Sequence, residues 1–314
     1  MLCINIIIRR QWVENEKLSY PIIQLPLEMT SPNFFSNRMM WIGFTIVAII
    51  DIVNGLHFLF PTIPKVFSKR YNIALSSPPF NAMGNLPFAM YPFVIGLGFL
   101  IPLDLSFSCW LFFWFWKLQL VLANIIGLRA LPGFPYLHSQ AIGGYIGVTL
   151  VALYVSRPHL LVVCKRLFSL GKILDESNEV MSHRAIIGLL GVSSILLLAL
   201  CYKSGMSMTA AFAFFLLYFL ISLGITRMRA ELGAPVHDIH YTGPEQIMVW
   251  IVGTRRLGAA NLTVMSLFWF LTRTHYSHVM PHQLEGFKLS TQTGVNQRKV
   301  AFAIVLACAV GVLS

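Results

Sequence analysis

Long apolar runs separated by short polar stretches make up most of this 314-residue chain. A run of about 20 apolar residues can cross the ~30 Å hydrocarbon core of a bilayer as an α-helix. The pattern therefore predicts an all-α, polytopic transmembrane helical bundle, organised as a single integral membrane domain over residues 1–314. The expected membrane segments are residues 39–60, 87–101, 104–128, 138–156, 185–202, 207–226, 257–272 and 299–314.

Two of the expected elements differ from ordinary spans. Residues 87–101 form a short apolar run that ends at a break near Pro102, so they are either a short tilted span or half of a broken, re-entrant hairpin. An ordinary helix–turn–helix is the plainer alternative. Before this run, residues 61–86 are rich in Pro, Asn and Ser, which predicts a long irregular loop. After Pro158, residues 159–176 place a basic stripe opposite a leucine-rich face, which predicts an amphipathic interfacial helix.

Composition excludes the soluble classes. Hydrophobic residues make up 56% of the chain and charged residues 11%, with a mean hydropathy of +0.70. The net charge of +11 comes from basic residues between the apolar runs, as in cytoplasmic loops, so the expected partner is the lipid bilayer and no nucleic acid. Basic clusters in residues 9–38, 157–184 and 227–256 predict a shared cytoplasmic face, which requires residues 87–101 to cross.

The cysteines, one glycine pair and the two ends of the chain suggest helix packing and a partial sequence, and no disulfide or zinc site. The five cysteines are scattered without a C-x-x-C pair, so neither a disulfide framework nor a zinc knuckle is expected. Gly143 and Gly147 form a G-x-x-x-G face for close helix packing. Residues 1–8 and 300–314 resemble cut membrane helices, and we expect the chain to be a fragment of a larger membrane protein.

The first polar intrusion into an apolar run lies between residues 102 and 124. At 100° per residue, Ser106, Lys117 and Asn124 fall within roughly 20° of one another on a helix. A lysine inside a membrane helix costs roughly 2.5–3.5 kcal/mol unless it faces protein, water or a partner charge. We therefore expect an interior polar path whose candidate lining residues are Asp104, Ser106, Ser108, Lys117 and Asn124.

A second intrusion comprises Asp51, Asn54 and His57, which lie on one helix face about 120° wide. Ionisable groups inside a membrane mark functional sites, and histidine titrates near neutral pH. The trio therefore predicts a proton- or cation-linked site. An equally weighted alternative is that these side chains only fix packing near the helix end.

The third intrusion is Arg227, Arg229 and Glu231 at the end of an apolar helix, followed by a connector rich in Gly, Pro and His. Such a connector can form the mouth or gate of a substrate path. The alternative is that the arginines are positive-inside anchors with Glu231 as their partner.

The histidines of residues 237–240 (HDIH) and 275–282 (HYSHVMPH) have the ligand chemistry of a divalent metal site. Pro281 and the polar context argue against a regular helix there, so we interpret them as interfacial loop histidines and expect no metal site and no cofactor. No phosphate-binding loop and no nucleophile elbow occurs, and no catalytic residue is assigned.

Three stretches carry a family resemblance: RRQWVENEKLSYPIIQLPLEM (residues 9–29), IPLDLSFSCWLFFWFWKLQ (residues 101–119) and RMRAELGAPVHDIHYTGPEQ (residues 227–246). Together they resemble a family of uncharacterised bacterial polytopic membrane proteins that is distantly similar to oligopeptide transporters, the proton-coupled carriers of peptides and metal chelates. The resemblance implies the bacterial inner (cytoplasmic) membrane and the middle part of a protein about twice as long. The transporters' signature motifs are not found, so no substrate-binding residue is carried over.

These features predict a secondary-transporter-like protein that moves a small peptide-like or metal-chelate solute by alternating access, with proton coupling left open. The small-molecule substrate itself is unknown, and a homo-oligomer is compatible with the pattern. Two other classes stay open. A membrane-embedded enzyme needs a nucleophile or metal cluster at one depth, whereas a structural or accessory subunit needs no polar path.

Overall fold

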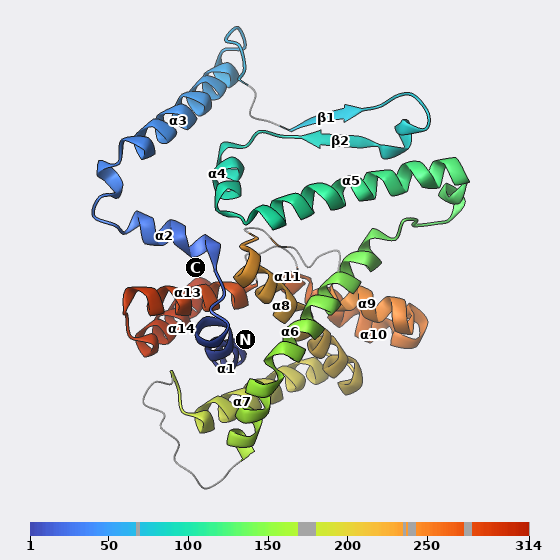
Figure 1. The fold of residues 1–314 in the computed structure, drawn as a ribbon. Helices are drawn as coiled ribbons and strands as arrows, with labels where there is room; N and C mark the ends of the chain where they lie inside the picture. Colours follow the sequence, from blue (N-terminus) through green and yellow to red (C-terminus); the bar gives the residue numbers. More distant parts are fainter. Residues whose placement is uncertain (67–69, 169–179, 235–236, 238–242, 273–277, 314) are drawn as a thin grey trace. The chain divides into compact units, whose positions relative to one another are not determined.

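The computed structural model of the chain describes residues 1–66, 70–168, 180–234, 237, 243–272 and 278–313. These residues are mostly helical (Figure 1), which confirms the predicted fold class. They form two compact units, which are described separately. Unit 1 comprises Met1–Tyr20 and His138–Ser314, and unit 2 comprises Pro21–Leu137.

Unit 2 contains two long helices and a small hairpin. The side chain of Asn37 accepts a hydrogen bond from the amide of Met39 and caps the first long helix, while Pro102 begins the second. Its helices are η2 (Pro21–Ile23), α2 (Gln24–Met29), η3 (Phe34–Ser36), α3 (Arg38–Leu59), η4 (Phe80–Met83), α4 (Pro92–Leu100), α5 (Leu103–Ile126) and η5 (Leu128–Ala130). Strands β1 (Tyr71–Ala74) and β2 (Asn85–Phe88) pair antiparallel, with Tyr71 opposite Phe88.

Unit 1 contains three long helices and several short ones. Ser182 and Ser207 each accept a hydrogen bond from a backbone amide three residues later, which caps the second and third long helices. The N-terminal elements are α1 (Leu2–Arg9) and the π-helix η1 (Arg10–Asn15). The others are α6 (Leu137–Phe168), α7 (His183–Lys203), α8 (Met208–Leu232), α9 (Pro244–Val252), α10 (Thr254–Leu267), α11 (Trp269–Thr272), α13 (Val279–Thr293) and α14 (Gln297–Leu313).

Five helices in the described part of the chain are long and apolar enough to cross a membrane. They correspond to five of the eight expected segments, so the structure is that of an integral membrane protein as far as length and composition decide it. The candidate spans are Arg38–Leu59, Leu103–Ile126, Leu137–Val163, Arg184–Lys203 and Met208–Leu232.

The other three expected segments are shorter or broken. Helix α4 has 9 residues and rises only about 14 Å, less than half of a ~30 Å hydrocarbon core. Residues 257–272 divide between α10 and α11, and Gly258 has a non-helical φ of 77° inside α10. Helix α14 has 17 residues. Crossing by these three segments stays a prediction.

Two local expectations differ from the structure. Helix α6 continues through Pro158, so the predicted start of a separate interfacial helix at residue 159 is wrong; residues 169–176 lie outside the described part. Membrane helices tolerate proline because neighbouring groups re-satisfy the freed carbonyl. The irregular loop expected over residues 61–86 contains strand β1 and the start of β2, which pair through backbone groups that hydropathy does not report.

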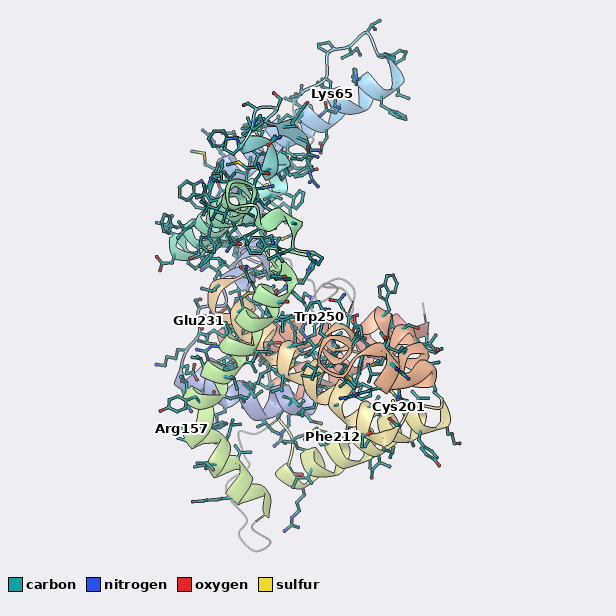
Figure 2. The ribbon with its side chains drawn as sticks, turned by 90° about the vertical axis from the view of Figure 1, so that its right-hand side faces the viewer. Lys65, Arg157, Cys201, Phe212, Glu231 and Trp250 are labelled. Atoms are coloured by element: carbon teal, nitrogen blue, oxygen red, sulfur yellow. The ribbon has the colours of Figure 1, made fainter. Side chains whose placement is uncertain are left out.

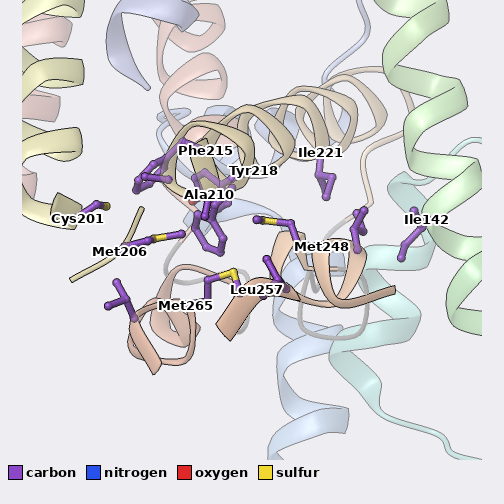
Figure 3. Close-up of a cluster of buried hydrophobic side chains, with 14 of the residues drawn as sticks. Ile142, Cys201, Met206, Ala210, Phe215, Tyr218, Ile221, Met248, Leu257 and Met265 are labelled. Carbon is purple, nitrogen blue, oxygen red and sulfur yellow. The ribbon is translucent and has the colours of Figure 1, made fainter. Parts of the chain in front are cut away.

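Helix α8 is the centre of the core of unit 1. It has the largest buried share of the five candidate spans, 56%. Figure 3 shows Phe215, Tyr218 and Ile221 of α8 among the side chains of Met248 from α9 and Met265 from α10. Burial of such large apolar side chains stabilises each by about 1.5–3 kcal/mol relative to exposure in water.

Helices α6 and α8 approach closely at Gly224. A Cβ added there would lie 2.3 Å from Oγ1 of Thr149, and that hydroxyl donates a hydrogen bond to the carbonyl oxygen of Leu220 at 2.9 Å. The predicted close-packing face at Gly143 and Gly147 has no atom within 4 Å of either added Cβ. The glycine that brings two helices together is therefore on α8 and not on α6.

Candidate functional site

A polar cluster, buried except for the exposed His282, lies where the end of α8 packs against α13. We call it the Arg229 cluster, and it consists of His237, His278, His282 and Glu285 with Arg229. Gly233 ends α8 in the left-handed region (φ 70°), and its amide donates to the carbonyl of Arg229 at 2.9 Å. This cap fixes the helix end that carries the arginine.

Arg229 and Glu285 form a two-point ion pair. Nε of Arg229 donates to Oε1 of Glu285 at 2.5 Å, and Nη2 donates to Oε2 at 3.1 Å. The two side chains are 6% and 14% exposed. Charges removed from water to this degree need good geometry and several hydrogen bonds to compensate their desolvation, which the paired contacts supply.

His282 lies one helical turn before Glu285 and touches both charges. Its Nδ1 is 3.3 Å from Nη2 of Arg229 and 3.4 Å from Oε2 of Glu285. An unprotonated Nδ1 accepts from the arginine, whereas a protonated Nδ1 donates to the carboxylate. Nδ1 of His282 is therefore within reach of both members of the ion pair.

The pKa of Glu285 reflects opposing effects. Burial alone would raise the pKa of this carboxyl, but hydrogen bonds from His282 and Arg229, together with their charges, outweigh burial and hold the pKa below its usual value. Glu285 is therefore ionised in the folded protein near neutral pH.

A second histidine pair adjoins the ion pair. Nδ1 of His278 and Nε2 of His237 are 3.0 Å apart, and the two rings meet edge to face. His278 is 0% and His237 3% exposed. Burial, followed by the nearby charges of His237, His282 and Arg229, lowers the pKa of His278 to about 3. His278 is therefore neutral near neutral pH.

The same end of α8 is tied to the N-terminal segment. Arg227 pairs with Glu16 and also with Glu231, whose carboxylate is 2.9 Å from Nε; Glu231 is labelled in Figure 2. The guanidinium of Arg227 lies 5.4 Å from the ring centroid of Trp12, which is a cation–π contact. These contacts fix residues 12–16 against the end of α8.

Tyr20 completes this region and has a strained backbone. Its φ is 45°, rare for a residue with a side chain, and its amide donates to the carbonyl of Ala230 at 2.9 Å. The side chain is 2% exposed, and its hydroxyl has no hydrogen-bond partner among the described residues. Burial, and then the charge of Glu285, raises the pKa of Tyr20 above its usual value. Nζ of Lys288 lies 5.6 Å from the tyrosine ring centroid.

Lys117, the predicted centre of a polar path, is held by backbone groups of unit 2. Its ammonium donates to the carbonyls of Met83 at 2.8 Å and Asn85 at 2.9 Å, and it lies 4.3 Å from the ring centroid of Trp116. The side chain is buried at 3% exposure. These contacts fasten the hairpin segment to α5 and compensate the buried charge locally.

The other predicted residues on α5 do not share this environment. Asp104 and Ser106 are exposed, and Asn124 is half-buried. Ser108 donates its hydroxyl hydrogen to the carbonyl of Asp104 at 2.6 Å, a contact within the helix. Lys117 is therefore the only fully buried residue among the five that were predicted to line a polar path on α5.

The residues predicted on α3 mostly hold the loop that follows it. Oδ1 of Asn54 accepts from the amide of Val66 at 3.0 Å, and Nδ1 of His57 lies 2.6 Å from the carbonyl of Ile63. Asp51 is exposed. These contacts match the packing alternative for Asn54 and His57, and a proton-linked role of the trio stays a prediction.

Sequence reasoning found one side of the Arg229 cluster and missed the other. Arg227, Arg229 and Glu231 were candidates, whereas Glu285 and Glu16 were not. The nearest signal was the His282-x-x-Glu285 spacing, which puts both side chains on one helix face. Pro281 lies in the first turn of α13, where proline is tolerated, so the expectation that it prevents a helix was wrong.

A metal site has no support in the described residues. No group of three or more histidine, cysteine, aspartate or glutamate side chains there could hold a metal ion. Asp238, His240 and His275, which belonged to the two histidine motifs, lie outside the described residues.

Comparisons with known proteins complete the description of the site. A search of curated proteins and a search of solved structures found no match. A family model matches residues 1–314, the whole chain. The chain therefore belongs to DUF6785, a family of unknown function.

Proposed function

We propose that this chain is a secondary-transporter-like membrane protein that moves a small peptide-like or metal-chelate solute by alternating access, with the Arg229 cluster as its polar centre. The observation that carries the proposal is the buried Arg229–Glu285 pair beside the candidate span α8. Ionisable groups buried within helical membrane proteins mark substrate and ion pathways.

The helices around the cluster add support. Between residues 244 and 293 the described chain forms the short helices α9, α10, α11 and α13, and α8 packs against α9 and α13. Short and broken helices are tolerated at membrane depth where they line protein or water, and transporters build binding sites from them. The left-handed backbone of Tyr20 and Lys17 beside the cluster is the kind of strain that gathers at functional sites.

Proton coupling belongs to the same proposal. Nδ1 of His282 contacts both Arg229 and Glu285, so a proton added to this imidazole would alter an ion pair that joins α8 to α13. A change in that pair is a means of biasing two arrangements of packed helices.

Solute uptake into proteoliposomes tests the proposal. We expect a panel of labelled di- and tripeptides and peptide-like metal chelates to include a solute whose uptake exceeds that of empty liposomes and increases with an inward proton gradient. Glu285→Gln, which removes the charge and keeps the shape, should lower that uptake at least tenfold. Glu28→Gln, at an exposed position in unit 2, is the matched control and should transport normally.

Uptake that is unchanged in Glu285→Gln would contradict the assignment of the polar centre. Uptake no greater than in empty liposomes for every solute would contradict transport of these two classes and favour an accessory subunit. A membrane-embedded enzyme is the second candidate, and the buried His237–His278 pair is the observation in its favour, because imidazoles can accept and donate protons.

A further inference from the structure

A cavity of about 380 Å³ opens between the N-terminal π-helix and helices α6 and α7 of unit 1, apart from the Arg229 cluster. Its volume falls within the range of small-molecule sites. Its polar lining residues are Arg10, Gln11, Asn15 and His159. Its apolar lining residues are Ile6, Ile7, Val162, Val163 and Ile186. The cavity therefore suits a ligand with a polar head and an apolar body.

Three of the polar lining residues come from an unusual helix. Residues Arg10–Asn15 form a π-helix, and the amide of Glu16 donates to the carbonyl of Gln11 at 2.8 Å as part of that wider winding. π-Helical turns are rare and occur frequently at functional sites. This winding brings Arg10, Gln11 and Asn15, three polar side chains of one short segment, to the same cavity.

The formal charge of the lining residues is positive, and Arg10 carries it. Its side chain is 47% exposed, and its Nε lies 3.9 Å from Oε2 of Glu14. Nε2 of His159 lies 3.0 Å from the carbonyl oxygen of Ile7. Lys165 and Arg184 are exposed on the two helices that form the wall. An anionic head group is therefore favoured over a zwitterionic one.

The cavity lies at the ends of two candidate spans. Val162 and Val163 are the last residues of the span Leu137–Val163, and Ile186 belongs to the first turn of the span Arg184–Lys203. If these helices cross, the cavity lies at head-group depth on the side where two of the basic clusters gather. Anionic lipids are attracted to basic pockets between helices on the cytoplasmic side.

We propose that this cavity binds one anionic phospholipid, with the phosphate-containing head group at Arg10 and His159 and an acyl chain along Ile7, Val162 and Ile186. Soluble phosphate esters share the head-group chemistry but lack the acyl chain. The apolar wall therefore assigns the lipid as the occupant.

Native mass spectrometry of the purified chain tests the lipid site. Phosphatidylglycerol should be retained over phosphatidylcholine of the same chains, and Arg10→Gln should reduce its retention about fivefold. Val162→Trp places a large side chain in the cavity and should reduce retention as much, without a change of charge. The controls are Arg157→Gln and Val155→Trp, at exposed positions on α6 that do not line the cavity (Arg157 is labelled in Figure 2). Both should retain phosphatidylglycerol like the unchanged chain.

Equal retention of the two lipids, or equal loss in the cavity variants and the controls, would overturn the proposal. Glycerol 1-phosphate added at millimolar concentration separates the two sources of a phosphate group. If it displaces phosphatidylglycerol fully, the site recognises the soluble ester and the lipid assignment is wrong. If the lipid stays bound, the acyl chain is required, as proposed.

Discussion

At the scale of single residues, a buried charge is stable only where its partners replace the water that it loses. Lys117 is compensated by two carbonyls and an aromatic ring, all of them close to the hairpin that it fastens. Arg229 is compensated by the carboxylate of Glu285, which His282 also contacts. The first arrangement anchors a loop to α5, and the second joins α8 to α13.

Glu285→Gln should destabilise the protein. Removal of one partner leaves Arg229 buried without a full counter-charge, which typically costs about 3–5 kcal/mol. Thermal unfolding in detergent, followed by tryptophan fluorescence, measures the loss. The exposed control Glu28→Gln should unfold at the temperature of the unchanged protein. If Glu285→Gln also unfolded at that temperature, the Arg229–Glu285 pair would contribute nothing to stability.

His278 makes stability depend on pH. Its folded pKa of about 3 lies below the unfolded value of about 6.5, so its contribution to stability is complete above pH ~6.5 and is lost as the pH falls towards ~3. His278→Asn removes this titration and should flatten the pH dependence of unfolding by up to about 1.4 kcal/mol per pH unit in that range. The exposed control His138→Asn should keep the original slope, and an equal effect of both would contradict the assignment.

Lys117→Met tests the anchoring role. Charged hydrogen bonds to two carbonyls would be lost, each worth about 1.5–3 kcal/mol, although the methionine keeps the apolar packing. Hydrogen exchange should increase selectively in residues 71–88. An increase of the same size in Lys165→Met, where the lysine is exposed, would argue against this role.

At the scale of elements, hydropathy locates long apolar helices well and everything else poorly. Helix α8 was predicted because the run that forms most of it is apolar. Arg227 and Arg229 were found as candidates because they interrupt the end of that run. Glu285 was missed because it is 56 residues from Arg229, and no local pattern reports a pairing at that separation. The hairpin was missed because a Pro- and Ser-rich sequence has the composition of a loop. The continuation of α6 through Pro158 was missed because proline usually ends a helix, although membrane helices tolerate it.

Gly224→Leu tests the close approach of α6 and α8. The new side chain would meet the Thr149 hydroxyl and the Tyr145 carbonyl, so the helices must separate or the protein must lose stability. Overpacking of this kind typically costs about 1–3 kcal/mol. Gly188→Leu on α7, where an added Cβ has no atom within 4 Å, is the matched control. Thermal unfolding should distinguish the two variants, and equal stability would contradict the contact.

At the scale of the molecule, contacts within unit 1 agree with three successive crossings by α6, α7 and α8. Thr149 of α6 bonds to Leu220 of α8, and further along both helices Trp12 contacts Ser156 of α6 and Arg227 of α8. The C-terminal ends of α6 and α8 therefore lie at one level, as expected when a single helix, α7, returns between them. Basic residues lie near the C-terminal ends of both α6 and α8, as expected at a cytoplasmic face.

These three crossings underlie both the polar centre and the lipid site, and side-specific cysteine labelling tests them most directly. In a chain without its native cysteines, Ser139→Cys and Ser204→Cys should react with an impermeant reagent from one face of the membrane. Ser182→Cys and Glu231→Cys should react from the opposite face. Labelling of all four positions from the same face would contradict the account.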